Sequence, residues 1–318
     1  MSYLIIGGLG FIGSNFADYL LNNGQEVVIV DNLESGNIDF LNPHKYNPNL
    51  KIFIHDIKLW EEIKDELVKS NIDCVIHLAS NANIAEAITN PSIDFMNGTL
   101  ITHHVAELVR ILQIKKVIYA SGSGVYGDRG TTLLTENGVD LEPISPYGAS
   151  KLAGEALLRS YAYMFDINVF VFRFANVVGQ NQTHGVGLDF LKSLKNNRTS
   201  LKILGDGNQS KQYIHVLDLI DAIMHAVKVS KENLVLNVGT TSRISVKEIA
   251  QMCLDLLQID KSSFEFNYTG GTRGWDGDVP LVNISIDKIQ NLGWRPKLNS
   301  REAMQIALKS IWDQIKNS

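Results

Sequence analysis

A glycine-rich turn, Gly7-Gly8-Leu9-Gly10-Phe11-Ile12-Gly13, joins the apolar run Leu4-Ile5-Ile6 to an amphipathic segment at 16–21. The run is typical of a buried strand, and the segment has helical spacing. Glycines at 7, 10 and 13 permit a tight turn, close approach of the backbone to a ligand, and close packing of the helix. The helix N-terminus then offers free N–H groups and a positive dipole end to a pyrophosphate. An ordinary turn also uses glycines, but a strand before and a helix after favour the phosphate-binding interpretation.

Strands and helices continue to alternate through the first half of the chain. Short β-branched runs lie at 27–30, 51–54, 74–76, 116–119 and 169–172, with helical patterns at 60–68, 100–112 and 146–164. This alternation predicts a parallel sheet covered on both faces. After about residue 180 the pattern breaks up, and helical spacing returns at 216–229, 246–257 and 301–315. We expect an α/β protein with a Rossmann-type doubly wound parallel sheet and a smaller mixed α/β C-terminal lobe.

The composition narrows the classes of partner. The 318 residues carry a net charge of −5, which leaves no electrostatic footprint for nucleic acid or an anionic membrane surface. Cys74 and Cys253 are too far apart for a metal-binding motif or a disulfide framework. No apolar run approaches a membrane span, and the first basic residue, Lys45, comes too late for a signal peptide. We therefore expect a cytoplasmic protein with no metal, membrane or nucleic-acid partner.

An acidic residue, Asp31, ends the second predicted strand 18 residues after Gly13. A carboxylate there can accept both ribose hydroxyls of an adenosine and would repel a 2′-phosphate, so the predicted cofactor is NAD rather than NADP. The alternative is a turn or cap role in Asp31-Asn32-Leu33. Asp56, just past the third strand, is predicted at the adenine edge, although its spacing equally suits a helix N-cap.

The segment Ser145-Pro146-Tyr147-Gly148-Ala149-Ser150-Lys151 opens the predicted helix at 146–164. Tyr147 and Lys151 are four residues apart and so share one helix face. The phenol pKa is ordinarily about 10, and an adjacent ammonium together with a bound nicotinamide cation should lower it. The phenolate could then take a proton from a sugar hydroxyl while hydride leaves its carbon. The alternative is an aromatic ring packed on a lysine stem, which the dinucleotide-binding pattern upstream makes the weaker interpretation.

Further motifs follow in order along the chain: His77-Leu78-Ala79, Val125-Tyr126-Gly127, Arg173-Phe174-Ala175-Asn176-Val177-Val178-Gly179, Tyr213-Ile214-His215-Val216-Leu217-Asp218 and Gly277-Asp278-Val279-Pro280. With the residues above, they resemble the extended short-chain dehydrogenase/reductase family over nearly the whole chain. Within it, they are similar to nucleotide-sugar 4-epimerases of the UDP-galactose 4-epimerase type. The resemblance implies an NAD-binding domain at 1–178, with return segments from the second half, and a nucleotide-sugar-binding lobe at 179–318. It also implies a homodimer paired through helices at 99–112 and 146–164.

The resemblance assigns roles to single residues. Tyr147 would be the base and acid, with Lys151 as its partner and Ser123 as a third catalytic residue. The implied cofactor contacts are Gly7, Gly10, Phe11, Ile12, Gly13, Asp31, Asn32, Ser35, Gly36, Asp56, Ile57, Leu78, Ala79, Ser80, Tyr147 and Lys151. The implied substrate contacts are Asn176 at the diphosphate, Lys211 and Arg273 at the phosphates, Tyr213, Asp278 at the nucleotide ribose or at Arg273, and Val282 beside the sugar C2 substituent. Valine is smaller than tyrosine, so we expect an N-acetylated sugar to be accepted; alternatively, Val282 packs only into the core.

Two positions depart from the family pattern. Gly122 stands where relatives have a Ser or Thr that helps to bind the C4 hydroxyl, and Ser123, or less readily Ser121, could supply that hydroxyl instead. Asp94 stands where relatives use Asn near the cofactor. The 4,6-dehydratases of the family carry Asp-Glu after the hydroxyl residue, where this chain has Ser123-Gly124, so dehydration and decarboxylation are disfavoured.

The function expected from these features is NAD-dependent 4-epimerisation of a nucleotide sugar, and the resemblance implies a UDP-hexose or a UDP-N-acetylhexosamine. A second hypothesis is a nucleotide-sugar 4-dehydrogenase or 4-keto reductase, which would accumulate NADH or need an acceptor. A third is a nonenzymatic NAD-binding regulator on the same fold. Retention of both Tyr147 and Lys151 argues against the third hypothesis.

Overall fold

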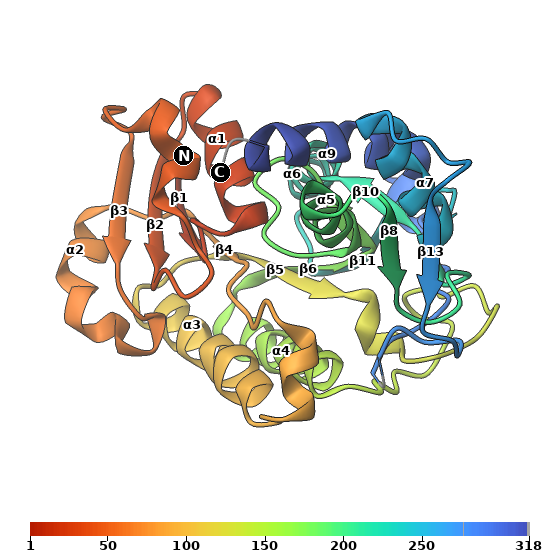
Figure 1. Ribbon diagram of the computed structural model, residues 1–318. Helices are drawn as coiled ribbons and strands as arrows, with labels where there is room; N and C mark the ends of the chain where they lie inside the picture. Colours follow the sequence, from red (N-terminus) through yellow and green to blue (C-terminus); the bar gives the residue numbers. More distant parts are fainter. Residues whose placement is uncertain (276, 317–318) are drawn as a thin grey trace.

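A seven-stranded parallel sheet forms the centre of the molecule (Figure 1). The computed structural model describes residues 1–275 and 277–316, and all statements below concern these residues. In the order β11-β6-β5-β4-β1-β2-β3, the strands are Leu234–Val238, Asn168–Phe174, Lys116–Gly122, Cys74–His77, Ser2–Ile6, Glu26–Asp31 and Leu50–Ile54. The strand order reverses between β1 and β4, and ligands of such sheets bind in the crevice at the carboxyl ends of the strands beside this point.

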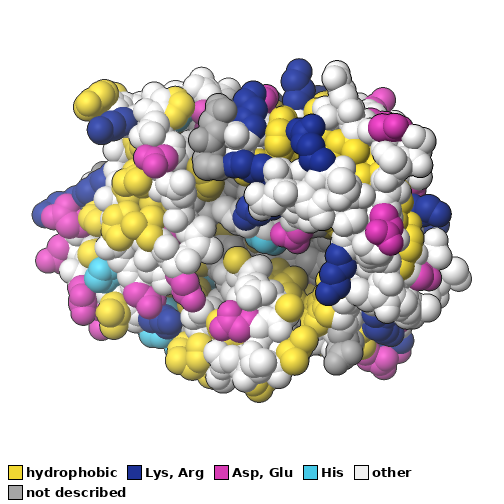
Figure 2. Space-filling model, viewed as in Figure 1, with side chains coloured by type: hydrophobic (Ala, Val, Ile, Leu, Met, Phe, Trp, Pro, Cys, Tyr) yellow, Lys and Arg dark blue, Asp and Glu magenta, His cyan; other side chains and the backbone are white. Residues whose placement is uncertain are grey.

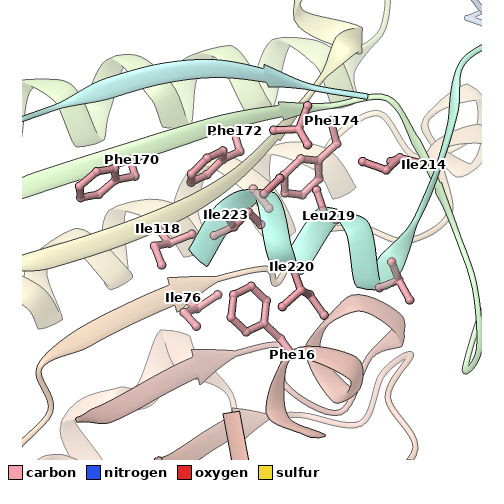
Figure 3. Packing of buried hydrophobic residues seen from close by; sticks show 14 of the residues in the cluster. Phe16, Ile76, Ile118, Phe170, Phe172, Phe174, Ile214, Leu219, Ile220 and Ile223 are labelled. Carbon is pink, nitrogen blue, oxygen red and sulfur yellow. The ribbon is translucent and has the colours of Figure 1, made fainter. Parts of the chain in front are cut away.

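Helices cover both faces of this sheet because successive side chains of a buried strand point to opposite faces. On one face, α1 (Phe11–Asn22) and α6 (Val216–Val229) pack against alternate strand residues such as Ile5, Ile76 and Phe172. Figure 3 shows Phe16 of α1 and Ile220 of α6 meeting over the sheet. On the other face, α3 (Leu100–Ile111) and α4 (Pro146–Phe165) pack against the intervening residues. The short α2 (Lys64–Lys69) lies beside β3 at the sheet edge (Figure 1).

A smaller lobe with its own hydrophobic cluster follows the sheet. Its main helices are α5 (Val186–Asn196), α7 (Val246–Leu257) and α9 (Ser300–Ile315), and their apolar faces meet around residues such as Leu191, Ile249 and Leu308. Short strand pairs complete it: β8 (Ser200–Ile203) with β13 (Glu265–Tyr268), β9 (Ser210–Lys211) with β12 (Ile244–Ser245), and β7 (Asn176–Val178) with β10 (Tyr213–His215). One further short helix, α8, spans Asp287–Asn291.

The predicted α/β class and doubly wound sheet are confirmed, and all six strands expected in the first half are present. The segment 60–68 is not one helix, because a 3-10 helix, Ile57–Ile63, ends at the non-helical backbone of Ile63 and α2 begins only at Lys64. Both α6 and β11 follow residue 178 and yet belong to the large sheet layer. A domain division near residue 178 with such return segments stays a prediction.

Candidate active site

A cavity of about 970 Å³ lies between the carboxyl ends of the sheet strands and the smaller lobe. Figure 2 shows the corresponding hollow near the middle of the molecule. Its wall includes the turn after β1, the ends of β2, β4 and β5, the start of α4 and several segments of the smaller lobe. The volume is at the upper end of the range usual for small-molecule sites. A ligand in this cavity would touch both parts of the chain.

The glycine-rich turn forms one end of the cavity, and its geometry requires glycine. Gly7 has φ +81°, and a Cβ there would lie 2.8 Å from the backbone nitrogen of Ala79. A Cβ on Gly13 would overlap the carbonyl oxygen of Gly7, so only glycine lets α1 start this close to β1. Gly10 is the N-cap of α1, and no side chain caps the helix. The first-turn residues line the cavity, so this cradle fits the pyrophosphate of NAD.

Asp31 closes the end of β2 beside this turn and is only 8% exposed. Its Oδ2 accepts the backbone N–H of Leu9 and its Oδ1 that of Leu33, both at 2.9 Å. The carboxylate lines the cavity together with Asn32 and Ser35. Asp31 therefore fixes the turn and also lines the cavity, and its contact with the adenosine ribose stays a prediction.

The other residues predicted at the cofactor divide into two groups. Ile57, Leu78, Ala79 and Ser80 line the cavity, whereas Gly36 is not among the lining residues. A Cβ on Gly36 would lie 2.7 Å from Oδ1 of Asp31, so this glycine serves the packing of the loop. Asp56 lines the cavity and also accepts the backbone N–H of Lys58 at 2.9 Å, which makes it the N-cap of the 3-10 helix. Its contact with adenine stays a prediction.

The start of α4 places Tyr147 and Lys151 in the cavity wall. Ser145 caps this helix by accepting the N–H of Gly148, and Pro146 occupies the first turn. Lys151 is 3% exposed; its Nζ donates to the carbonyl of Ala120 at 2.9 Å and lies 5.6 Å from the centre of the Tyr147 ring. Burial lowers the pKa of Lys151 to about 8. The predicted sharing of one helix face is thus observed.

The Lys151 ammonium alone does not lower the pKa of Tyr147 below its ordinary value, and the lowering expected with a bound nicotinamide stays a prediction. Burial raises the pKa of the phenol to about 12, a hydrogen bond with the Ser80 side chain opposes that rise, and the Asp94 carboxylate adds to it. Lys151 already donates to a backbone carbonyl. Desolvation of the phenolate therefore outweighs the nearby ammonium, and the resting side chain is a neutral phenol.

Two serines beside Gly122 could supply the hydroxyl that Gly122 lacks, and the structure gives them different surroundings. Ser121 donates to Oε1 of Glu155 at 2.5 Å and is 3% exposed. Glu155 also forms a buried ion pair with Arg173 at 2.7 Å, so the Ser121 hydroxyl is engaged in a structural network. Ser123 lines the cavity beside Gly122. The structure thus favours Ser123 over Ser121 as the source of a hydroxyl.

The residues predicted at the substrate lie mainly on the smaller lobe's side. Asn176, Lys211, Tyr213, Asp278 and Val282 all line the cavity. Nζ of Lys211 forms an ion pair with Oδ1 of Asp278 at 2.6 Å, and Val282 is 5% exposed because it also packs into the large core.

Arg273 is not among the lining residues. Its guanidinium binds Asp128 at 2.6 Å and the carbonyl oxygen of Asp278 at 2.6 Å. Asp278 therefore contacts Arg273 through its backbone and Lys211 through its carboxylate. A phosphate contact from Arg273 stays a prediction.

The ionisable wall residues that the sequence analysis did not assign include His184 and Asp189, in the loop before α5 and in its first turn. Burial lowers the pKa of His184 and raises that of Asp189. Their signal was a histidine and an aspartate around a glycine-rich helix start, which by itself is common. In the part of the chain that the structure describes, no group of three or more His, Cys, Asp or Glu side chains could hold a metal, and no helix is long and apolar enough to cross a membrane.

Comparison with known proteins identifies the family of this chain. Residues 3–239 match the model of the NAD dependent epimerase/dehydratase family. A putative UDP-glucose 4-epimerase of Methanocaldococcus jannaschii is 31% identical over 99% of this chain and 98% of its own. A crystal structure of a UDP-galactose 4-epimerase is 32% identical, with a TM-score of 0.87, and covers 99% of this chain and 100% of its own. The UDP-glucose 4-epimerase of Thermotoga maritima, solved with UDP-glucose, is 28% identical, with a TM-score of 0.89 over the same shares.

These matches confirm the resemblance expected from the motifs, and the NAD dependence of the family confirms the cofactor predicted from the glycine-rich turn and Asp31. The chain belongs to the NAD-dependent epimerase/dehydratase family.

Proposed function

We propose that this protein is a nucleotide-sugar 4-epimerase that inverts C4 of a UDP-hexose or a UDP-N-acetylhexosamine through a transient 4-keto sugar. The observation that carries this proposal is the opening of Tyr147 and Lys151 into the same cavity as the glycine-rich cradle. The similar proteins named above are epimerases of UDP-glucose or UDP-galactose, which supports UDP as the nucleotide.

Tyr147 carries the proton in this mechanism. Bound NAD supplies the chemistry of hydride removal and return at C4. Once ionised, the phenolate oxygen of Tyr147 takes the proton of the 4-hydroxyl as that carbon is oxidised, and the resulting phenol returns the proton when the carbon is reduced from the opposite face. A pKa of about 12 means that the phenol must be activated, and positive charge gathered beside it in the closed site favours the phenolate. Lys151, with a pKa of about 8, is the residue of this chain that provides such charge.

The smaller lobe would hold the nucleotide diphosphate. Lys211 provides a cation in the wall there, and Asn176 provides amide donors from β7. The Lys211–Asp278 ion pair fixes the ammonium in place, and a phosphate would compete with the carboxylate for it. Because Lys lacks the planar fork of Arg, it would act as a point charge rather than as a bidentate clamp.

The direct test is incubation of the purified protein with a panel of UDP-sugars, with C4 inversion followed by NMR. We expect UDP-glucose and UDP-galactose to interconvert, and UDP-N-acetylglucosamine to be a second substrate. A 4-dehydrogenase or 4-keto reductase would instead accumulate NADH or require an acceptor, which absorbance at the NADH band detects in the same samples. Absence of turnover with bound NAD would favour the nonenzymatic regulator.

A further inference from the structure

Asp94 is a buried carboxylate that the mechanism above leaves without a role. It is 1% exposed and immediately precedes the turn η4 (Phe95–Thr99) that leads into α3. Its Oδ1 accepts a hydrogen bond from Nδ2 of Asn81 at 3.0 Å. Its Oδ2 is buried and has no hydrogen-bond partner among the described residues. Such a group is costly to bury unless a nearby charge compensates it.

The packing of η4, the turn that follows Asp94, is tight against the start of α4. A Cβ on Gly98 would lie 2.6 Å from Oγ of Ser150, so the two segments are closer together than any residue with a side chain at position 98 would permit. Ser150 directly precedes Lys151 in α4. Asn81, which holds the carboxylate from the other side, lines the cavity. Asp94 therefore lies just behind the wall that carries Tyr147 and Lys151.

The charges around Asp94 are few in the described chain. Burial raises the pKa of Asp94, while the Asn81 hydrogen bond and the positive charge of Lys151 on α4 favour its carboxylate form; Glu86 on the 3-10 helix Ile84–Ile88 repels that charge. Lys151 in turn also faces His77 at the end of β4, whose pKa burial and Lys151 lower to about 3, so this imidazole is neutral. Tyr119 of β5 and Tyr147 complete the ring of titratable groups, and burial raises the pKa of both phenols. Lys151 and Asp94 are thus the opposite charges of this buried cluster.

We propose that Asp94 is a positioning residue whose buried carboxylate keeps the proton on Lys151, and the proton on the Tyr147 phenol, while the active site is at rest. A negative charge favours the protonated form of both groups, since one is then a cation and the other is neutral. Asp94 acts on Lys151 against burial, and on Tyr147 in the same direction as burial. The inference rests on the proposed function for the importance of this proton, although the charge coupling itself does not depend on the substrate.

The test is a titration of the full-length protein labelled with ¹³C at the lysine Cε, followed by NMR between about pH 6 and pH 11, which brackets the ordinary lysine pKa. The Lys151 signal is the one that disappears in Lys151→Met. Asp94→Asn keeps the size of the side chain and an oxygen for Asn81 but removes the charge. We expect the midpoint of Lys151 to fall by about one pH unit, the low end of the effect of a close opposite charge. Asp94→Ser should lower it in the same direction.

The matched control is Asp166→Asn, which removes an exposed carboxylate at the left-handed C-cap of α4, where Asn is well tolerated. A Lys151 midpoint that moves no more in Asp94→Asn and Asp94→Ser than in Asp166→Asn would overturn the proposal. As an independent check, the pH at which kcat/KM for UDP-sugar inversion begins to rise should lie lower in Asp94→Asn than in the wild type, a change that loss of packing alone would not produce. If no UDP-sugar is inverted but the midpoint still falls, the proposed function fails and the role of Asp94 stands.

Discussion

At the scale of single residues, burial keeps Tyr147, the proposed proton carrier, as a neutral phenol. Burial holds the pKa of the Tyr147 phenol at about 12 and brings that of the Lys151 ammonium to about 8. Proton transfer then depends on charge that arrives with the bound ligands. This arrangement suits an enzyme that must neither lose hydride equivalents nor ionise its base before the substrate is enclosed.

Tyr147→Phe isolates the proton-transferring oxygen. We expect turnover to fall about 10²- to 10⁴-fold, the usual contribution of a general acid–base group. NAD should stay bound, because the ring and the cofactor cradle are unchanged, and absorbance of the extracted nucleotide measures this. Lys151→Ala should lower both turnover and NAD retention. Wild-type turnover in Tyr147→Phe would contradict the mechanism.

Substitution of Gly122, the last residue of β5, tests whether a hydroxyl at this position assists turnover. Its φ of −159° is extended backbone, and a Cβ there would meet no atom within 4 Å, so a side chain fits without rearrangement. We expect Gly122→Ser to keep the fold and to raise kcat for UDP-glucose, because it adds a hydroxyl in the cavity wall. Gly122→Ala is the matched control and should leave kcat unchanged. If both variants behave alike, a hydroxyl at position 122 plays no part in turnover. Loss of activity in Ser123→Ala would then show that Ser123 supplies the hydroxyl that binds the substrate.

Asp31→Ala tests the choice of cofactor. The carboxylate lies in the cavity wall and would repel the 2′-phosphate of NADP. The variant should bind NAD more weakly and discriminate less against NADP, as measured by titration calorimetry with each nucleotide. Because the carboxylate also accepts the backbone N–H groups of Leu9 and Leu33, a fall in thermal stability is expected as well. Equal affinity of the wild type for NAD and NADP would refute the role of Asp31.

At the scale of elements, local signals made the first half predictable. Ser145 as N-cap and Pro146 in the first turn predict the start of the helix at 146–164, and the observed α4 extends one residue further, to Phe165. The strand β11, the helix α5 and the network of Ser121, Glu155 and Arg173 were not assigned. Their partners are distant in sequence, and no residue near Glu155 in the sequence shows that it forms a buried ion pair with Arg173. Likewise, nothing local shows that Arg273 is held by Asp128, 145 residues away.

Substitution of Val282 tests how much room the cavity leaves for the C2 substituent of the sugar. Val282 lines the cavity and also packs into the large core, and its place beside the sugar stays a prediction. Val282→Tyr should depress turnover of UDP-N-acetylglucosamine more than that of UDP-glucose, because an added ring would occupy the room of the acetamido group. A loss of stability is also expected from overpacking, of about 1–3 kcal/mol. Thermal unfolding measures that loss, Val282→Leu is the smaller control, and equal losses on both substrates would remove the pocket argument.

At the scale of the whole molecule, α3 and α4 form an outer layer on one face of the sheet (Figure 1). Tyr161 of α4 donates to Glu107 of α3 at 2.5 Å, so the two helices form a joined surface. Large apolar side chains are exposed on and beside these helices, with Tyr163 93%, Met164 70% and Phe95 57% exposed. In a monomer these apolar side chains stay in contact with water, whereas a second copy of the chain could bury them in a two-fold contact of four helices.

We therefore expect a homodimer in which α3 and α4 of one subunit pack on the same helices of the other. Sedimentation equilibrium at micromolar concentration should give about twice the mass of one chain for the wild type. The double variant Tyr163→Asp with Met164→Asp places charge in the proposed contact and should shift the mass towards that of one chain while far-ultraviolet circular dichroism stays unchanged. Tyr46→Asp is the matched control, because Tyr46 is 89% exposed and lies outside both helices, so its mass should equal that of the wild type. A single-chain mass for the wild type would reject the dimer, and a dimer that survives the double variant would place the contact on another surface. Since α4 also carries Tyr147 and Lys151, a contact along it would restrain the helix that holds the catalytic pair, and the double variant should then lose turnover as it loses its partner.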